Sequence, residues 1–258
     1  MNLFQLNSIP WIKINEDILS DMLDSLKPVL DRIDLSNKPL SEEDKKKILH
    51  DWIAKRIYKY VTRLATEFTL TKAEDIKNMF YQVVNDIYIN SCELLNKESE
   101  ITFEELSILH KKLYPKWLWW ITVDKKGRTF KKLYPAWTIR TDKEIVRYEW
   151  WDYSYLDPKY INESLKKVSS FYQEEIITHP LIRIILSISC YGYIHPFYNW
   201  NGTLLMFYTY ILLLKKWYPM NDMLYKYFTG DQIWKDLINS RHNDSHGGLF
   251  RNFLETFS

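Results

Sequence analysis

Apolar residues recur at helical spacing through the first hundred residues of the chain. The recurrence predicts two helices between Glu16 and Phe68, with a break at Pro39 and Ser41. A third helix is expected over Ala73–Leu95. The chain therefore begins with a helical region.

Two N-cap signals mark helix starts in this part of the sequence. Ser41 followed by Asp44 is suited to cap the second helix. Thr102 and Glu105 form a T-x-x-E capping box, which predicts a fourth helix that continues to Leu113.

The pattern changes to alternating apolar and polar residues after residue 116. Trp117–Val123 and Thr129–Leu133 flank a turn with Gly127, an arrangement that predicts a β-hairpin. A second extended pair is expected between 137–140 and 144–151. The sequence thus places a strand-rich segment among helices.

Helical spacing returns at Asp157-Pro158, an N-cap residue followed by a proline suited to the first turn. Further helices are expected at roughly 179–194, 202–217, 231–241 and 248–257. The predicted fold class is mainly α, with the hairpin region inserted before the central helices.

Composition restricts the kinds of partner that are expected. The chain has 258 residues, of which 46% are hydrophobic and 16% aromatic, enough for a large core. Thirty-five basic and 33 acidic residues give a net charge of +2, and no basic face is clustered as in nucleic-acid binders. We therefore expect no nucleic-acid partner.

Cysteine use and apolar runs bear on location. Cys92 and Cys190 stand far apart in apolar contexts, which favours a reducing compartment and two core residues. The N-terminus lacks the pattern of a signal peptide, and the run Leu204–Leu214 is too short to span a bilayer. We expect a protein without membrane association, located in the cytoplasm or, as a secreted effector, in the cytosol of a host.

The segment Ile194–Gly202 is the strongest candidate for a functional site. A histidine-led turn closes there on Asn-Gly and runs directly into an apolar helix. The first turn of a helix has unpaired N–H groups, which with the helix dipole favour an anion. His195, a few residues earlier, is placed to act as a general base beside a bound phosphate.

The nine residues His195–Thr203 read HPFYNWNGT and resemble the Fic (Fido) family motif HPFx(D/E)GNGRxxR. The likeness covers about residues 100–258, because four other segments resemble family helices in the same order: Leu109–Leu113, Asp157–Phe171, Thr178–Ile182 and Trp234–Phe253. The resemblance implies a Fic-type helical core with a β-hairpin flap over 101–258, preceded by an N-terminal helical extension over 1–100.

The resemblance also implies a chemistry, since the family transfers a phosphate-containing group, usually AMP from ATP, to a hydroxyl of a target protein. His195 would be the general base, and Phe197 would anchor the loop. Phosphate would bind at Asn201, Gly202, Thr203 and Trp200. The hairpin from Trp137 to Trp151 would be the flap that binds the target protein by strand addition, with Trp137, Thr138, Ile139 and Arg140 at its start.

The sequence departs from the family motif at the positions that handle charge. Asn199 stands where the family has the acidic residue that holds Mg²⁺, and Trp200 replaces a glycine. Thr203 and Met206 replace two arginines, each of which would supply charge-assisted contacts worth roughly 1.5–3 kcal/mol. The inhibitory motif [S/T]xxxE[G/N] of many family members is absent as well. ATP or another nucleotide with Mg²⁺ is thus expected to bind weakly.

Several residues allow a structural and a functional interpretation. Asn199 is suited to ligate a metal or to cap the next helix, and Trp200 to stack on a flat ligand or to fill vacated space. The segment His242–His246 reads as a metal site or as a solvated loop. We interpret His50, His110 and His179 as helix or cap residues.

Two functions stay open on the sequence. The first is a Fic-type transferase of AMP or a related group with an altered donor, in which His195 activates a target hydroxyl. The second is a catalytically silent Fic-like protein that binds a partner through the flap and the tryptophan-rich hairpin. The target, the donor, the oligomeric state and the role of the N-terminal helices are left open.

Overall fold

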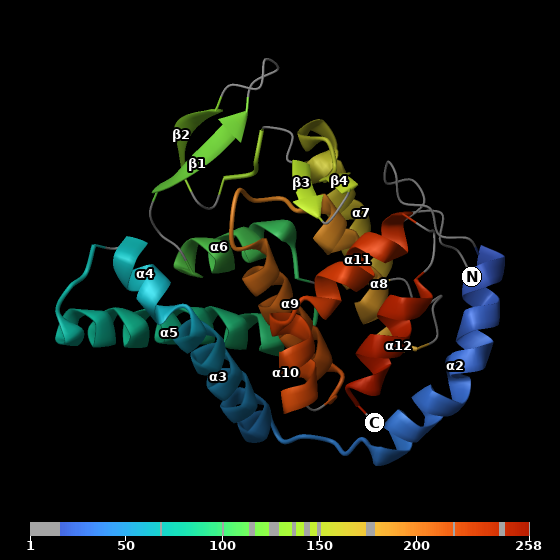
Figure 1. The fold of residues 1–258 in the computed structure, drawn as a ribbon. Coiled ribbons are helices and arrows are strands. Elements are labelled where there is room, and N and C mark those ends of the chain that lie inside the picture. The colour runs from blue at the N-terminus through green and yellow to red at the C-terminus, as the bar shows by residue number, and fades with distance from the viewer. Residues whose placement is uncertain are drawn as a thin grey trace.

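A computed structural model describes residues 16–67, 69–99, 101–113, 117–123, 129–135, 138–141, 145–148, 151–173, 179–218, 220–242 and 246–257. Most of these residues are helical, as the periodicity predicts (Figure 1). Two short pairs of antiparallel strands account for the extended part.

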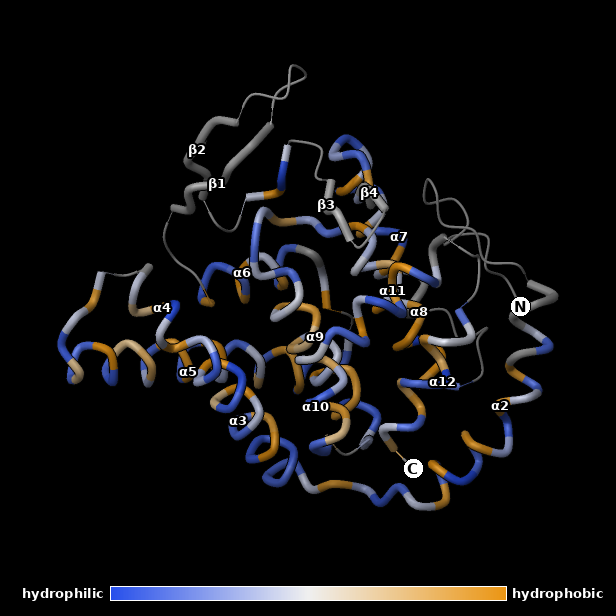
Figure 2. Tube along the Cα trace, viewed as in Figure 1, coloured by the Kyte–Doolittle hydropathy of each residue, from blue (hydrophilic) through white to orange (hydrophobic). Residues whose placement is uncertain are grey.

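Two apolar helices form the centre of the protein. They are α8 (Pro180–Ile194) and α9 (Asn201–Lys215), and nearly every residue of both is buried. The two helices pack against each other, and Figure 2 shows hydrophobic stretches along both of them. Each fully buried leucine or isoleucine contributes about 1.5–3 kcal/mol, so this pair supplies much of the core free energy. The predicted buried helix at 202–217 is confirmed.

Other helices surround this pair (Figure 1). The helices that pack on α9 are α3 (Glu42–Lys59), α5 (Ala73–Asn96) and α6 (Phe103–Leu113). Those that pack on α8 are α7 (Ile161–Gln173), α11 (Gln232–His242) and α12 (Gly247–Glu255). Helix α2 (Glu16–Ser36) contacts α12, and α4 (Val61–Glu67) contacts α3 and α5.

Both predicted N-caps are present. Ser41 Oγ accepts the backbone N–H of Asp44 at 3.0 Å. In the capping box, Glu105 N–H donates to Thr102 Oγ1 at 3.3 Å and Thr102 N–H donates to Glu105 Oε2 at 2.7 Å. The starts of α3 and α6 therefore follow from local sequence.

Other boundaries differ from the prediction. The region 16–68 holds three helices, since Tyr60 ends α3 before α4 begins. Helix α10 (Asp222–Thr229), capped by Asn221, was not predicted. Its eight residues are too few for periodicity to stand out from the loops around it.

The strands are partly as predicted. Strand β1 (Trp117–Val123) pairs antiparallel with β2 (Thr129–Pro135), which confirms the first hairpin. The pairing predicted for 137–140 with 144–151 is wrong, because β3 (Ile145–Tyr148) pairs with β4 (Trp151–Ser154). Ile139 instead forms a β-bridge with Phe197 of the loop between α8 and α9.

Buried residues from both sides of residue 100 form one hydrophobic cluster. Helices α3 and α5 take part in it through their contacts with α9. The division of the chain at residue 100 stays a prediction. Among the described residues, no helix combines the length and hydropathy that a membrane crossing requires.

Candidate functional site

The loop from His195 to Trp200 joins α8 to α9 through two left-handed residues. His195 ends α8 with φ 44°, and Trp200 precedes α9 with φ 62°. A residue with a side chain costs roughly 1–2 kcal/mol in this conformation. The loop therefore keeps a shape that suits glycine at position 200 although tryptophan stands there, and neighbouring contacts must hold it.

Asn201 fixes the loop from inside. Its Oδ1 accepts the N–H of Phe197 at 3.0 Å, and its Nδ2 donates to the carbonyl of Phe197 at 2.6 Å. This pair of bonds settles the orientation of the amide. Nδ2 also lies 3.4 Å from Nδ1 of His195, a contact too long to fix the tautomer of the imidazole.

Arg140 holds the end of α8, where backbone carbonyls lack helical partners. Its Nε donates to the carbonyl of His195 at 2.7 Å, and its Nη2 donates to those of Ile194, at 3.1 Å, and of Leu156. Only 1% of Arg140 is exposed. A cation at a helix C-terminus is also favoured by the helix dipole. Arg140, which the sequence assigns to the flap, therefore positions the loop.

His110 of α6 supports the loop from behind. Its Nε2 donates to the carbonyl of Asn199 at 2.8 Å, and its ring stacks on Phe197 at 4.1 Å between centroids. Complete burial lowers the pKa of His110 to about 4, so the imidazole is neutral at physiological pH. His110 lies on a helix as predicted, but its contact with Asn199 was not foreseen.

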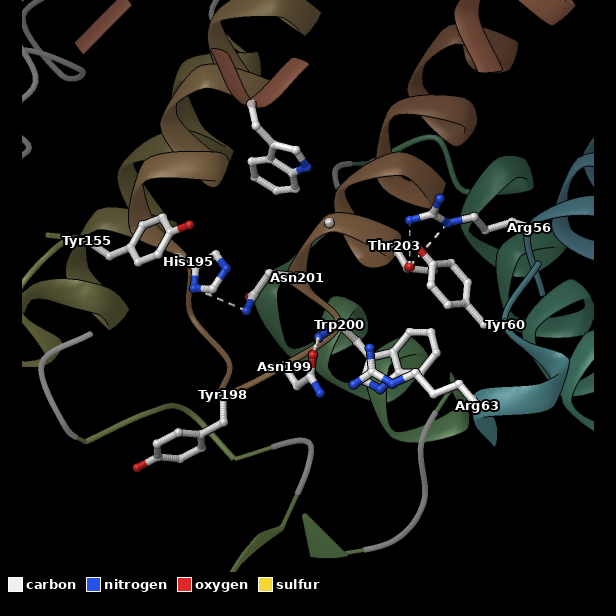
Figure 3. Close-up of a pocket in the computed structure, with 12 residues that line it drawn as sticks. Arg56, Tyr60, Arg63, Tyr155, His195, Tyr198, Asn199, Trp200, Asn201 and Thr203 are labelled. Atoms are coloured by element: carbon white, nitrogen blue, oxygen red, sulfur yellow. Dashed lines mark hydrogen bonds between the residues drawn. The ribbon is translucent and has the colours of Figure 1, made fainter. Parts of the chain in front are cut away.

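His195 presents its side chain to a pocket in front of the loop. The imidazole stacks on Tyr155, with 3.9 Å between ring centroids and 6° between the planes. The side chain is half-buried, and Figure 3 shows the ring beside Asn201. A neutral imidazole in this position can accept a proton from a hydroxyl group.

The pocket has a volume of about 310 Å³. Its described lining comes from the end of α3 and the start of α4, from Tyr155 after β4, from the loop, from the first turn of α9 and from α11 (Figure 3). The lining residues are Arg56, Tyr60, Arg63, Tyr155, His195, Tyr198, Asn199, Trp200, Asn201, Gly202, Thr203 and Trp234. The structure thus brings the five predicted loop and helix residues from Asn199 to Thr203 together with His195.

The first turn of α9 opens onto this pocket. Trp200 supplies no side-chain cap to the amides of this turn. Gly202 leaves room for Trp234, because a Cβ at Gly202 would lie 2.7 Å from the indole atom Cζ2. Close packing of Trp234 is therefore a reason for glycine here, and the predicted phosphate contact of Gly202 stays a prediction.

Arg56 of α3 reaches the pocket from a helix far away in sequence. Its Nε and Nη2 donate to Thr203 Oγ1 at 3.2 and 3.0 Å, and its guanidinium carbon lies 4.6 Å from the ring centroid of Tyr60. Only 5% of Arg56 is exposed, and burial lowers the pKa of its guanidinium. An arginine pKa starts high enough for the group to stay charged.

Trp200 belongs to the wall of the pocket. Its indole packs edge-on against Tyr60 at 5.2 Å between centroids, and the guanidinium carbon of Arg63 lies 5.0 Å from its ring centroid. Trp200 is 6% exposed. The indole is thus held against α3 and α4, and it leaves the volume of the pocket open.

The lining does not suit a magnesium ion. None of the described lining residues is Asp or Glu, and no group of three His, Cys, Asp or Glu side chains occurs in the part of the chain that the structure describes. Asn199 Oδ1 accepts the N–H of Trp200 at 2.8 Å, so this oxygen serves the turn. A hard dication prefers several carboxylate or carbonyl oxygens, and two arginines disfavour it further.

The other predicted residues lie elsewhere. Met206 is fully buried in α9. Thr138 and Ile139 are half-buried, whereas Trp137 and the segment 243–245 lie outside the described residues. His179 caps α8, because its Nδ1 accepts the N–H of Leu181 at 3.2 Å.

Sequence reasoning missed the contribution of α3 and α4 to the pocket. A signal was present, since Arg56, Tyr60 and Arg63 are spaced four and three residues apart and so fall on one helical face. Nothing local linked that face to the loop, which lies about 140 residues further along the chain.

The fold is similar to those of solved Fic proteins. A Fic domain-containing signaling protein from Bacteroides thetaiotaomicron matches with a TM-score of 0.58 and 16% identity, over 91% of this chain and 90% of that one. Fic-1 from C. elegans matches with a TM-score of 0.55 and 16% identity, over 93% and 69%. A Fic family protein from Desulfovibrio desulfuricans matches with a TM-score of 0.55 and 14% identity, over 96% and 74%.

No family model matches the sequence, and no curated protein matches it either. The likeness to solved structures shows that the chain has the Fic fold. The matched share exceeds residues 101–258, so helices of the first hundred residues take part in it.

Proposed function

We propose that this protein is a Fic-family transferase that moves AMP, or a related phosphate-containing group, onto a hydroxyl of a target protein. The observation that carries the proposal is the position of His195, which faces a pocket beside the uncapped first turn of α9. A base and an anion site side by side are the two elements that transfer of a phosphate-bearing group needs.

The reaction requires a hydroxyl, a donor and a base. The hydroxyl oxygen of the target bonds to phosphorus while the bond from phosphorus to the leaving phosphate or diphosphate breaks. His195 accepts the hydroxyl proton and later releases it to solvent. The amides at the start of α9 stabilise the negative charge on the phosphate oxygens. No step is assigned to a metal ion, because the lining does not suit one.

The target would dock beside the loop. Ile139 already forms one β-bridge to Phe197, so residues 138–141 run along the edge of the site. An extended target segment could add to this edge by main-chain hydrogen bonds. Thr138, Ile139 and Trp137 would contact it, whereas the buried side chain of Arg140 would not. We place this reaction in a cytosol, that of the producing cell or of a host.

A second candidate is a catalytically silent protein that binds a partner with the same surface. The specific observation in its favour is Asn199, which stands where the family motif has an acidic residue. Its amide oxygen accepts the N–H of Trp200, so this position offers no carboxylate to the pocket. A site built for Mg-ATP would need that charge. The open pocket and the position of His195 favour the transferase.

The test uses the full chain with a panel of labelled nucleotide and diphosphate-linked donors, incubated with cell extract and with the protein alone. We expect transfer of label to a protein hydroxyl. The variant His195→Asn should abolish transfer and leave the fold intact, because asparagine tolerates the left-handed conformation at this position. His50→Asn, at an exposed histidine of α3, is the matched control and should transfer label normally.

Absence of label with every donor, together with stable capture of one partner by both the wild type and His195→Asn, would favour the silent protein. Equal labelling by the wild type and His195→Asn would exclude His195 as the base.

A further inference from the structure

Arg56 is a buried cation whose charge is not balanced by any carboxylate among the described residues. It is 5% exposed and forms no ion pair with any described residue. Its Nη1 is buried without a hydrogen-bond partner in the described part of the chain. Its other bonds go to Thr203 and its ring contact to Tyr60, all of which are neutral groups. Folding thus retains a buried charge at a cost in stability.

The position of this cation gives a reason for that cost. Arg56 and Thr203 both line the pocket, and Thr203 stands in the first turn of α9. The first turn of α9 has no side-chain cap from Trp200, and its residues Asn201, Gly202 and Thr203 line the pocket. Arg63, stacked on Trp200, adds a second guanidinium to the lining. Two cations, the positive end of a helix and a described lining without Asp or Glu make the pocket attractive to an anion.

We infer that the pocket binds the phosphate or diphosphate group of a small ligand through Arg56, held on Thr203, together with Arg63 and the first turn of α9, and without a divalent cation. The inference rests on the proposed function, for which it names the class of donor: a phosphate ester or diphosphate whose charge two arginines can balance. Helices α3 and α4 thereby supply the charge that the loop does not contain.

The way in which Thr203 holds Arg56 supports this ligand class. The bonds from Nε and Nη2 to Thr203 fix the plane of the Arg56 guanidinium in advance, and its Nη1 remains to donate a charge-assisted hydrogen bond to a phosphate oxygen. Preorganisation reduces the entropy lost on binding.

The experiment measures binding of inorganic phosphate, pyrophosphate, ADP and ATP to the full chain by calorimetry, in EDTA and again with Mg²⁺. We expect pyrophosphate or ADP to bind in EDTA with an affinity at least as high as with Mg²⁺. Arg56→Met should weaken this binding at least about tenfold, since a charge-assisted hydrogen bond is lost. Arg32→Met, at an exposed arginine of α2, removes the same charge and should bind normally.

The melting temperature of the ligand-free protein separates a binding role from a structural one. If Arg56 serves the ligand, Arg56→Met should melt at the same temperature as the wild type or above it, because a buried unbalanced charge is removed. A purely structural arginine would instead lower the melting temperature while ligand affinity stayed the same. Arg56→Lys keeps the charge without the fork and should bind with intermediate affinity.

Three results would overturn the inference: no binding of any of the four probes, binding that requires Mg²⁺, or equal affinity of Arg56→Met and the wild type. Its failure is distinct from failure of the transferase. His195→Asn should still bind pyrophosphate, so binding without any transfer would remove the proposed function and leave the anion site. If Arg56→Met transferred label as well as the wild type does, the anion site would be removed and the proposed function would stand.

Discussion

The loop between α8 and α9 has one side that faces the core and one that faces the pocket, and the two are built differently. On the core side, Arg140 and His110 bond backbone carbonyls, and every contact holds the shape of the turn. On the pocket side, Asn199, Trp200 and Thr203 carry no charge, and Arg56 and Arg63 supply positive charge from other helices. The comparison shows that the shape of such a loop and the charge around it are separate properties, supported by different residues.

The largest expected effect comes from placing charge on the core side. Met206 is fully buried in α9, so Met206→Arg puts a guanidinium into an apolar environment without a partner. We expect a loss of at least about 4 kcal/mol in the free energy of unfolding, measured by urea denaturation. Met223→Arg, at a methionine that is 53% exposed, should change it by less than about 0.5 kcal/mol. A stable, folded Met206→Arg protein would show that the family arginine can still be accommodated there.

A smaller loss is expected when the support of the loop is removed without adding charge. Arg140→Met deletes the bonds to the carbonyls of Ile194, His195 and Leu156 and leaves these groups buried. The expected cost is about 3 kcal/mol in the free energy of unfolding. Hydrogen exchange of the loop amides would show the local opening. Unchanged exchange would mean that Asn201 and His110 hold the turn without Arg140.

The next effect depends on pH. The pKa of His110, about 4 in the folded protein, lies below its value of about 6.5 in the unfolded chain. The unfolded state therefore binds more protons between these values, and stability falls as the pH is lowered from 6.5 to 4, by up to about 1.4 kcal/mol per pH unit.

Denaturation at several pH values measures this slope. In His110→Gln the free energy of unfolding should depend less on pH, by up to about 1.4 kcal/mol per pH unit, which corresponds to one proton. His50→Gln, at an exposed histidine, should keep the slope of the wild type. Identical slopes in all three proteins would mean that His110 is protonated without breaking its bond to Asn199.

The smallest effect is expected on the pocket side. Asn199→Asp restores the acidic residue of the family motif, but none of the other lining residues that the structure describes carries a carboxylate. We expect the free energy of unfolding to change by less than about 0.5 kcal/mol. Mg²⁺ should raise the melting temperature no more than in the wild type. A clear stabilisation of this variant by Mg²⁺ would show that one carboxylate is enough to create the metal site.

The parts of the fold that were predictable depend on local information. The capping box at Thr102 and the apolar run of α9 each determine their structure within a few residues, and the structure contains both. The partner of 138–141 could not be predicted, since Ile139 pairs with Phe197, which lies 58 residues further along the chain. Propensity shows that a strand forms, but distant packing selects its partner.

The same limit applies to the site. His195 and the start of α9 follow from one continuous segment, so their proximity was foreseeable. Arg56 lies 147 residues before Thr203, and only the packing of α3 on α9 brings the two together. A residue can also have an unforeseen role, as Arg140 does, because its burial depends on the whole fold.

The bond between Arg56 and Thr203 has a consequence for how such proteins diverge. The guanidinium of Arg56 takes up space beside residue 203, so a second arginine at that position would meet a like charge. Homologues with this arrangement should therefore carry arginine at one of the two positions and a small polar residue at the other. The two sites are expected to covary as alternatives, and each exchange between them would need a pair of compensating mutations.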